Sequence, residues 1–368
     1  MTDKMQVNLR QVAMEILYEV QKNNGLLHVV LSDALKKYQY LDKNERSFIS
    51  RLVQGTEERK IELDYIIDSF SKTPVKKQKD VIRIILEMSV YQLKYMDSVP
   101  ASAVCNEAVK LAVKKNFGTL RGFVNGVLRN IARNIDNIEY PDKSTNTDKY
   151  LSVKYSVPEE LAGYFLKKFG DNETEEMFEA FNKDKSTYIR CNTKKTDIAG
   201  LTAALEAEGV TVTNEGIDKR IDYALKISGY DYLGGLKSFR DGLFFVQDIS
   251  SMLASQGGFI KRDAYVIDVC AAPGGKSINA ALMADIGHVS SRDISGRKVS
   301  LIKENAERLG IDNITYKVWD AVKKDEESVE KADVLICDLP CSGLGIIGRK
   351  PDIKYNVTYE KIKELALL

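Results

Sequence analysis

The chain has 368 residues, of which 44% are hydrophobic and 29% are charged; this is enough for two or three domains with buried cores. No apolar run approaches the roughly 18 residues of a membrane span, and the first residues lack the apolar core of a secretion signal. Five scattered cysteines favour a reducing cytoplasm over a disulfide framework. With two histidines and no Cys-x-x-Cys pair, we expect no metal site.

The net charge of +1 conceals an asymmetry along the chain. Residues 1–150 contain 24 basic and 19 acidic residues, whereas the remaining 218 residues contain 30 basic and 34 acidic ones. The amino-terminal part is therefore the better suited to contact a polyanion.

The first 140 residues have the spacing of amphipathic helices. Between Leu9 and Val20 apolar residues recur at intervals of three and four, and Asp42 with Glu45 has the spacing of a capping box. We expect residues 1–140 to form an all-α bundle of six or seven helices. Its later helices are predicted at 63–70, 81–95, 101–115 and 121–135.

A polar segment, 141–149, is the best candidate linker in the chain. The next region, 150–240, reads as linker helices followed by a small α+β insert. Its helical pattern covers 158–182, and a short β-α-β alternation follows at 188–192, 198–208 and 210–213.

From residue 242 onward, strands and helices alternate. Short apolar runs typical of buried parallel strands occur at 264–270, 288–294, 314–319 and 332–337. We expect residues 242–368 to form a Rossmann-like α/β domain, which binds its ligand at the carboxyl ends of the strands.

The sharpest motif, Asp-Val-Cys-Ala-Ala-Pro-Gly-Gly-Lys-Ser at 268–277, lies between the first of these strands and a helix. Gly274 and Gly275 remove side chains so that a ligand can approach backbone N–H groups near the start of a helix. The motif matches neither the P-loop nor the dinucleotide-binding glycine pattern.

An acidic residue ends each of the next three strands: Asp293, Asp320 and Asp338. Asp293, about 20 residues beyond the glycine turn, suits a ribose diol, and Asp320 is placed to meet a base. Asp338 begins the sequence Asp-Leu-Pro-Cys-Ser-Gly, which contains Cys341. A cysteine in this loop can add to C6 of a pyrimidine or help to reverse such an addition, and the addition activates C5 toward a methyl group.

These two motifs resemble those of the RNA cytosine-5 methyltransferases of the Nop/Sun group, and the segment 245–251 is similar to that group's lead-in. The helical start, with Gly-Phe-Val-Asn-Gly-Val-Leu-Arg-Asn at 122–130, resembles a NusB-type RNA-binding domain. The combination is similar to the bacterial RsmB (Sun/Fmu) family, which uses S-adenosylmethionine to methylate 16S ribosomal RNA.

The resemblance implies a role for each residue of the two motifs. Asp293 would hold the ribose, and Asp320 and Asp338 would line the adenine and methyl-donor ends. Asp338 could also bond to the target base, and Leu339 stands where the family more often has a small residue. The methionine end of the cofactor would be wrapped by Cys270, Ala271, Ala272, Pro273, Gly274, Gly275 and Lys276.

The resemblance also implies two cysteines with different roles. Cys341 would assist release of the methylated product, and the nucleophile would lie in a later motif, beyond residue 368. We therefore expect an incomplete sheet and a chain that binds the cofactor poorly or not at all and does not turn over.

The stretch 110–133 contains six basic residues and no acidic one, which suits phosphate contact. We expect it to hold small-subunit rRNA, protein-free or in early assembly, while a cytosine leaves the stack to be methylated. The six residues are Lys110, Lys114, Lys115, Arg121, Arg129 and Arg133.

Two other functions compete with this one. A non-catalytic RNA-binding or ribosome-assembly factor of the same family would keep the helical domain without turnover. An amino methyltransferase would require an Asn/Asp-Pro-Pro-Tyr/Phe loop after the fourth strand. This chain has Asp338-Leu-Pro-Cys341 there, which argues against that function.

Overall fold

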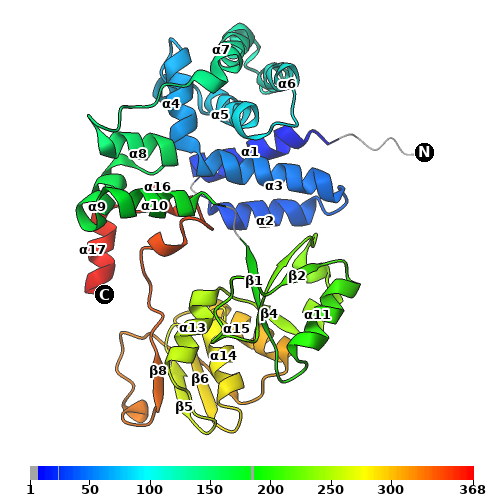
Figure 1. Ribbon diagram of the computed structural model, residues 1–368, viewed down its shortest axis with the longest axis vertical. Helices are drawn as coiled ribbons and strands as arrows, with labels where there is room; N and C mark the ends of the chain where they lie inside the picture. The colour runs from blue at the N-terminus through cyan, green and yellow to red at the C-terminus, as the bar shows by residue number, and fades with distance from the viewer. Residues whose placement is uncertain (1–6, 24, 184–185) are drawn as a thin grey trace. The chain divides into compact units, whose positions relative to one another are not determined.

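The computed structural model describes residues 7–23, 25–183 and 186–368. The chain divides into two compact units (Figure 1). The helical unit comprises residues 1–184 and 342–363, and the sheet unit comprises residues 185–341 and 364–368.

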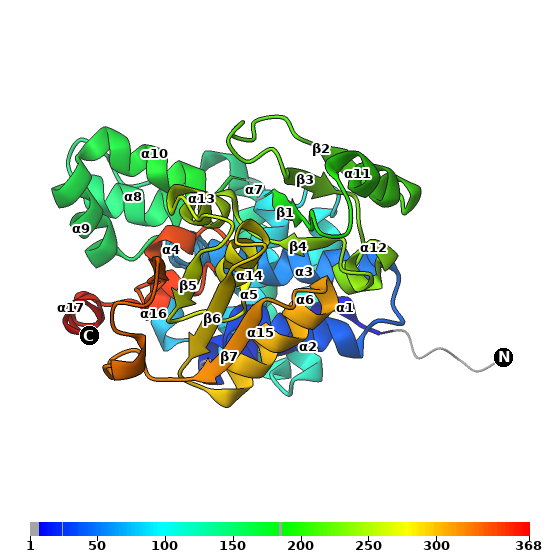
Figure 2. The same ribbon diagram turned by 90° about the horizontal axis from the view of Figure 1, so that it is seen from below.

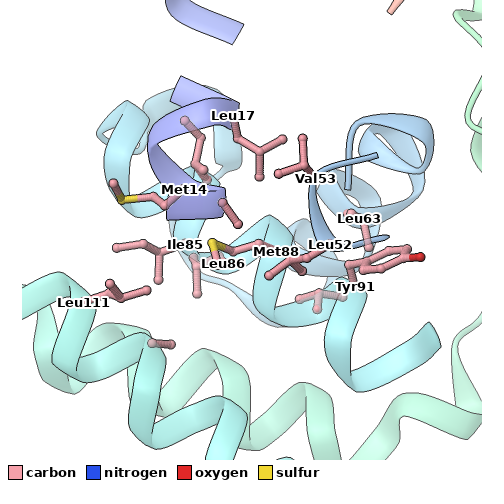
Figure 3. Packing of buried hydrophobic residues seen from close by; sticks show 14 of the residues in the cluster. Met14, Leu17, Leu52, Val53, Leu63, Ile85, Leu86, Met88, Tyr91 and Leu111 are labelled. Atoms are coloured by element: carbon pink, nitrogen blue, oxygen red, sulfur yellow. The ribbon is translucent and has the colours of Figure 1, made fainter. Parts of the chain in front are cut away.

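The helical unit begins with a seven-helix bundle, as the sequence predicts. Its fifth helix, α5, is buried on nearly all sides, so it lies at the centre of the bundle (Figure 3). The predicted capping box is present, since the Asp42 backbone N–H donates to the Glu45 carboxylate at 3.0 Å. The helices are α1 (Leu9–Asn23), α2 (Leu27–Lys37), α3 (Lys43–Glu58), α4 (Lys60–Phe70), α5 (Asp80–Tyr95), α6 (Ala101–Lys114) and α7 (Arg121–Asn134).

Close packing in this bundle depends on one glycine. A Cβ atom on Gly55 of α3 would lie 2.0 Å from the Tyr91 ring of α5. The glycine therefore lets the ring lie directly against the α3 backbone.

Three more helices complete this part of the helical unit: α8 (Thr147–Tyr155), α9 (Glu159–Phe169) and α10 (Asp171–Phe181). Helix α8 begins within the predicted linker, because Asn146 caps it by accepting a hydrogen bond from the Lys149 N–H. The predicted helical stretch 158–182 forms two helices, which separate at Gly170, where φ is +82°.

A distant part of the chain returns to the helical unit. The short helix α16 (Ile353–Asn356) follows Asp352, whose carboxylate accepts a hydrogen bond from the Leu27 N–H at the start of α2. Lys354 donates to the Glu58 carbonyl and Tyr355 to the Glu57 carbonyl, at 2.6 and 2.9 Å. Residues 342–363 are thus an integral part of this unit.

The sheet unit begins with a small antiparallel sheet of order β2-β3-β1-β4. The predicted β-α-β alternation corresponds to β1, α11 and β2, and the sheet has two further strands that the sequence did not indicate. The elements are β1 (Thr187–Cys191), α11 (Ile198–Ala207), β2 (Thr211–Thr213), β3 (Ala224–Ser228), α12 (Lys237–Arg240) and β4 (Phe244–Val246).

A parallel sheet of order β7-β6-β5-β8 follows; Figure 2 shows β5, β6 and β7 side by side. Its strands confirm the four predicted ones, and α14 connects β5 to β6 and α15 connects β6 to β7 in the βαβ manner of a Rossmann-like fold. The elements are α13 (Ile249–Gly257), β5 (Tyr265–Asp268), α14 (Gly275–Met283), β6 (His288–Asp293), α15 (Gly296–Leu309), β7 (Ile314–Val318) and β8 (Val334–Ile336), and the last helix is α17 (Tyr359–Leu367).

In the described part of the chain, every helix is too short or too polar to cross a membrane.

Candidate functional site

The predicted glycine turn connects β5 to α14. Asp268 ends β5 with 1% of its surface exposed, and its Oδ2 accepts a hydrogen bond of 2.6 Å from the Ser277 hydroxyl. Gly274 stands at the N-cap of α14 with φ +104°, a conformation that side chains disfavour. The hydrogen bond between Asp268 and Ser277 therefore connects the end of β5 to the first turn of α14.

A cavity of about 240 Å³ opens beside this turn in the sheet unit. Most of the predicted cofactor residues line it, so the structure brings together residues from β5, the turn, α14 and the loop after β8. The lining residues are Phe245, Val246, Gln247, Asp248, Ser251, Asp268, Cys270, Ala271, Ala272, Pro273, Gly275, Lys276 and Asp338.

Gly275 has no side chain to occupy the space next to Phe245 and Gln247 in the cavity lining. A Cβ atom there would lie 3.3 Å from the Phe245 ring and 3.6 Å from the Gln247 side-chain nitrogen. Lys276 forms an ion pair with Asp338, with the nitrogen and oxygen 2.5 Å apart. Asp338 itself is 58% exposed, which leaves its second oxygen accessible to a ligand.

Asp268 is the most perturbed acid of the cavity. Burial is the main cause, and together with the neighbouring Asp338 charge it raises the pKa of Asp268 to about 6, against the hydrogen bond from Ser277. The Cys270 backbone N–H also lowers the pKa of this carboxyl, although no hydrogen bond of ordinary geometry reaches the buried Oδ1 from the described residues. A buried carboxylate oxygen in this state favours a cationic or hydrogen-bond-donating ligand.

The other two strand-end acids lie outside the cavity lining. Asp293 is 4% exposed and accepts backbone hydrogen bonds from Ala272 and Ile294, at 3.2 and 2.8 Å. It therefore ties the glycine turn to the end of β6. Asp320, beyond β7, accepts from the Val322 N–H at 3.1 Å.

Cys341 is exposed in the loop after β8 and does not line the cavity. It immediately precedes the segment that belongs to the helical unit. A second exposed cysteine, Cys337, lies four residues before it.

Of the six predicted RNA-contacting residues, two lie on α6, three lie on α7, and Lys115 directly follows α6. Lys110 pairs with Glu107 and Lys115 with Glu15. The side chains of the other four are exposed and form no hydrogen bond or ion pair with the described residues: Lys114, Arg121, Arg129 and Arg133.

The sequence did not indicate a buried pair at the cavity, formed by Arg190 and the lining residue Gln247. Arg190 of β1 is 1% exposed and donates to the Gln247 side chain at 2.5 Å and to the Gly275 carbonyl at 2.8 Å. Gln247 belongs to the segment 245–251, whose resemblance to the family lead-in marked it as part of the site. Nothing in the sequence indicated that Arg190 would contact Gln247. Arg190 thereby supports the turn from the antiparallel sheet.

Comparison with known proteins agrees with this arrangement. Residues 7–133 match the NusB family, and residues 260–368 match the family described as 16S rRNA methyltransferase RsmB/F.

The chain is 36% identical to the probable ribosomal RNA small subunit methyltransferase B of Bacillus subtilis, over 98% of this chain and 79% of that protein. It is 32% identical to the protein of the same description from Synechocystis, over 98% and 80%. A solved structure, PH0851, shares the fold with a TM-score of 0.76 at 24% identity, over 99% of this chain and 81% of that one. The chain therefore belongs to the RsmB/F family of 16S rRNA methyltransferases, and its amino-terminal region is NusB-like.

Proposed function

We propose that this protein transfers a methyl group from S-adenosylmethionine to C5 of a cytosine in small-subunit rRNA, in the cytoplasm, before ribosomal proteins cover the RNA. The observation that carries the proposal is the cavity formed by the turn 270–276, Asp268 and Asp338. The relatives described as small-subunit methyltransferases support the choice of substrate.

The residues of the cavity fit the proposed cofactor. S-adenosylmethionine supplies an electrophilic methyl group on a positively charged sulfur. Asp268 offers negative charge on the cavity wall, and the half-exposed Asp338, which is paired with Lys276, offers an accessible carboxylate oxygen. Residues 270–276 would hold the methionine end, Asp293 the ribose and Asp320 the adenine.

The proposed reaction needs a cysteine thiolate. Its sulfur adds to C6 of an extruded cytosine, C5 takes the methyl group, a base removes the C5 proton, and the S–C6 bond breaks to release 5-methylcytosine. The attacking thiolate is assigned to a cysteine other than Cys341. Cys341 is assigned to release, and its exposed position after β8 leaves it accessible to the RNA.

The helical unit would hold the RNA during this reaction. Lys114, Arg121, Arg129 and Arg133 present unpaired positive charge on α6 and α7, which suits phosphate contact without base recognition. Base recognition would then fall to the sheet unit.

The test uses protein-free small-subunit rRNA that carries tritium at C5 of cytosine. Methylation at C5 displaces the tritium into water, whereas methylation elsewhere on the base retains it. We expect tritium release when this RNA is incubated with the protein and S-adenosylmethionine. If methyl groups are transferred without tritium release, the C5 assignment is wrong; if RNA binds tightly without methyl transfer, the protein is a binding factor.

A Cys341→Ala variant tests the role of this thiol. We expect it to accumulate a covalent protein–RNA adduct that survives a denaturing gel. Cys337→Ala, which removes another exposed thiol of the same loop, serves as the matched control and should release product normally. If Cys341→Ala forms no adduct and releases no tritium, Cys341 is instead the nucleophile.

A further inference from the structure

A second pocket, of about 400 Å³, lies entirely within the helical unit. Helix α4 and the end of α5 form one side, and α8, which packs against α4 (Figure 1), forms another together with the end of α10. The proposed methyl transfer uses none of its residues. Its volume lies within the usual range for pockets that bind small molecules and single nucleotides.

The walls of this pocket contain four tyrosines, whose hydroxyls are held by neighbouring side chains. Tyr95 and Tyr140 both donate to Glu62, which is 2% exposed. Tyr155 donates to Glu175 at 2.9 Å, and the Tyr150 hydroxyl lies 2.7 Å from the ammonium of Lys154. Because the hydroxyls are fixed, the rings are held in place before any ligand arrives.

Positive charge accompanies these rings. The Arg59 guanidinium lies 5.1 Å from the centroid of the Tyr95 ring, and the Lys94 ammonium lies 5.6 Å from that of Tyr140. The Lys154 ammonium lies 5.0 Å from the Tyr150 centroid.

The charged lining is net positive. It contains four cationic side chains and two carboxylates, and each cation also lies 3.2 to 3.9 Å from a carboxylate: Arg59 and Lys94 from Glu62, Lys154 from Glu175, and Lys183 from Glu179. Aromatic surfaces among cations are the usual means by which proteins bind single-stranded nucleic acid, because the bases stack and the phosphates pair.

We propose that this pocket binds one unpaired nucleotide of the rRNA substrate, with the base against a tyrosine ring and the phosphate near Lys94 and Lys154. The inference rests on the proposed function only in taking RNA as the substrate. It adds an RNA contact separate from α6 and α7, and it does not depend on which base atom is methylated.

Tyr150 is the best residue for a test, because its ring is only half-buried and its hydroxyl does not bond to the buried Glu62. We expect Tyr150→Ala to weaken binding of a protein-free small-subunit rRNA fragment by about 5- to 150-fold, the usual effect of losing one stacked base. Tyr150→Phe keeps the ring and should bind within about twofold of the unsubstituted protein. Tyr40→Ala removes an exposed tyrosine of the same unit outside the pocket, and should not change binding.

Charge is tested separately by Lys94→Gln. Loss of one phosphate contact should lower the slope of log affinity against log salt by about 0.7 to 0.9. Circular dichroism of each variant should match that of the unsubstituted protein, and RNA carrying 4-thiouridine should crosslink to a peptide that contains Tyr140 or Tyr150.

The proposal is overturned if Tyr150→Ala and Tyr40→Ala bind RNA equally well, or if crosslinks map only to α6 and α7. If Tyr150→Ala does not change RNA binding, a protein would be the next occupant of the pocket to test. Failure of the proposed function gives a different result. In that case the unsubstituted protein binds RNA without releasing tritium, and Tyr150→Ala still weakens RNA binding.

Discussion

The buried carboxylate of Asp268 makes the stability of the sheet unit depend on pH. Its pKa is about 6 in the folded protein, against an ordinary value of 3.8. The folded state therefore disfavours the charged form, and stability is lost as the pH rises through this window. The full loss is about 3 kcal/mol, from 2.2 pKa units at 1.36 kcal/mol each. Between pH 5 and pH 8 it amounts to about 1.4 kcal/mol.

An Asp268→Asn variant removes the titrating group and keeps an oxygen that can accept from Ser277. We expect its unfolding free energy, relative to the unsubstituted protein, to rise by about 1.4 kcal/mol from pH 5 to pH 8. The single tryptophan, Trp319, lies in the sheet unit, so urea unfolding followed by its fluorescence reports on that unit.

Asp263→Asn is the matched control, because Asp263 is an exposed acid near the start of the same strand. Its unfolding free energy should follow that of the unsubstituted protein at every pH. A difference between Asp268→Asn and the unsubstituted protein that stays constant from pH 5 to pH 8 would refute the reasoning.

Three further substitutions have outcomes fixed by geometry. Gly274→Ala places a side chain at φ +104°, and should lower the unfolding free energy of the sheet unit by about 1–3 kcal/mol in the same fluorescence assay. Gly242→Ala brings a Cβ within 2.0 Å of the Arg308 carbonyl oxygen at φ +71°, and should cost roughly 2–4 kcal/mol; a stability near that of the unsubstituted protein would show that the loop can shift. Asp352→Ala removes the acceptor for the Leu27 N–H and should destabilise the helical unit by about 1 kcal/mol by circular dichroism, whereas Asp352→Asn should cost less.

The sequence predicted those parts of the fold that depend on local patterns. The seven helices and the four parallel strands follow from apolar spacing, and the glycine turn follows from the motif at 268–277. Strands β3 and β4 were not predicted, because β4 has three residues and neither strand shows a clear alternation.

Contacts between distant residues could not be read from the sequence. Arg190 and Gln247 are 57 residues apart, and Leu27 and Asp352 are 325 residues apart. Their side chains meet only after the elements that carry them have packed. For the same reason Asp293 and Asp338 could not be distinguished as cofactor residues from the sequence, although only Asp338 lines the cavity.

The return of residues 342–363 to the helical unit has a consequence for dissecting this protein. The chain passes between the two units after residues 184, 341 and 363, so no single cut separates them. A fragment ending at residue 184 lacks the partners of the Leu27 N–H and of the Glu57 and Glu58 carbonyls. A synthetic peptide of residues 342–363 should therefore bind such a fragment, and a titration of the fragment with the peptide checks this.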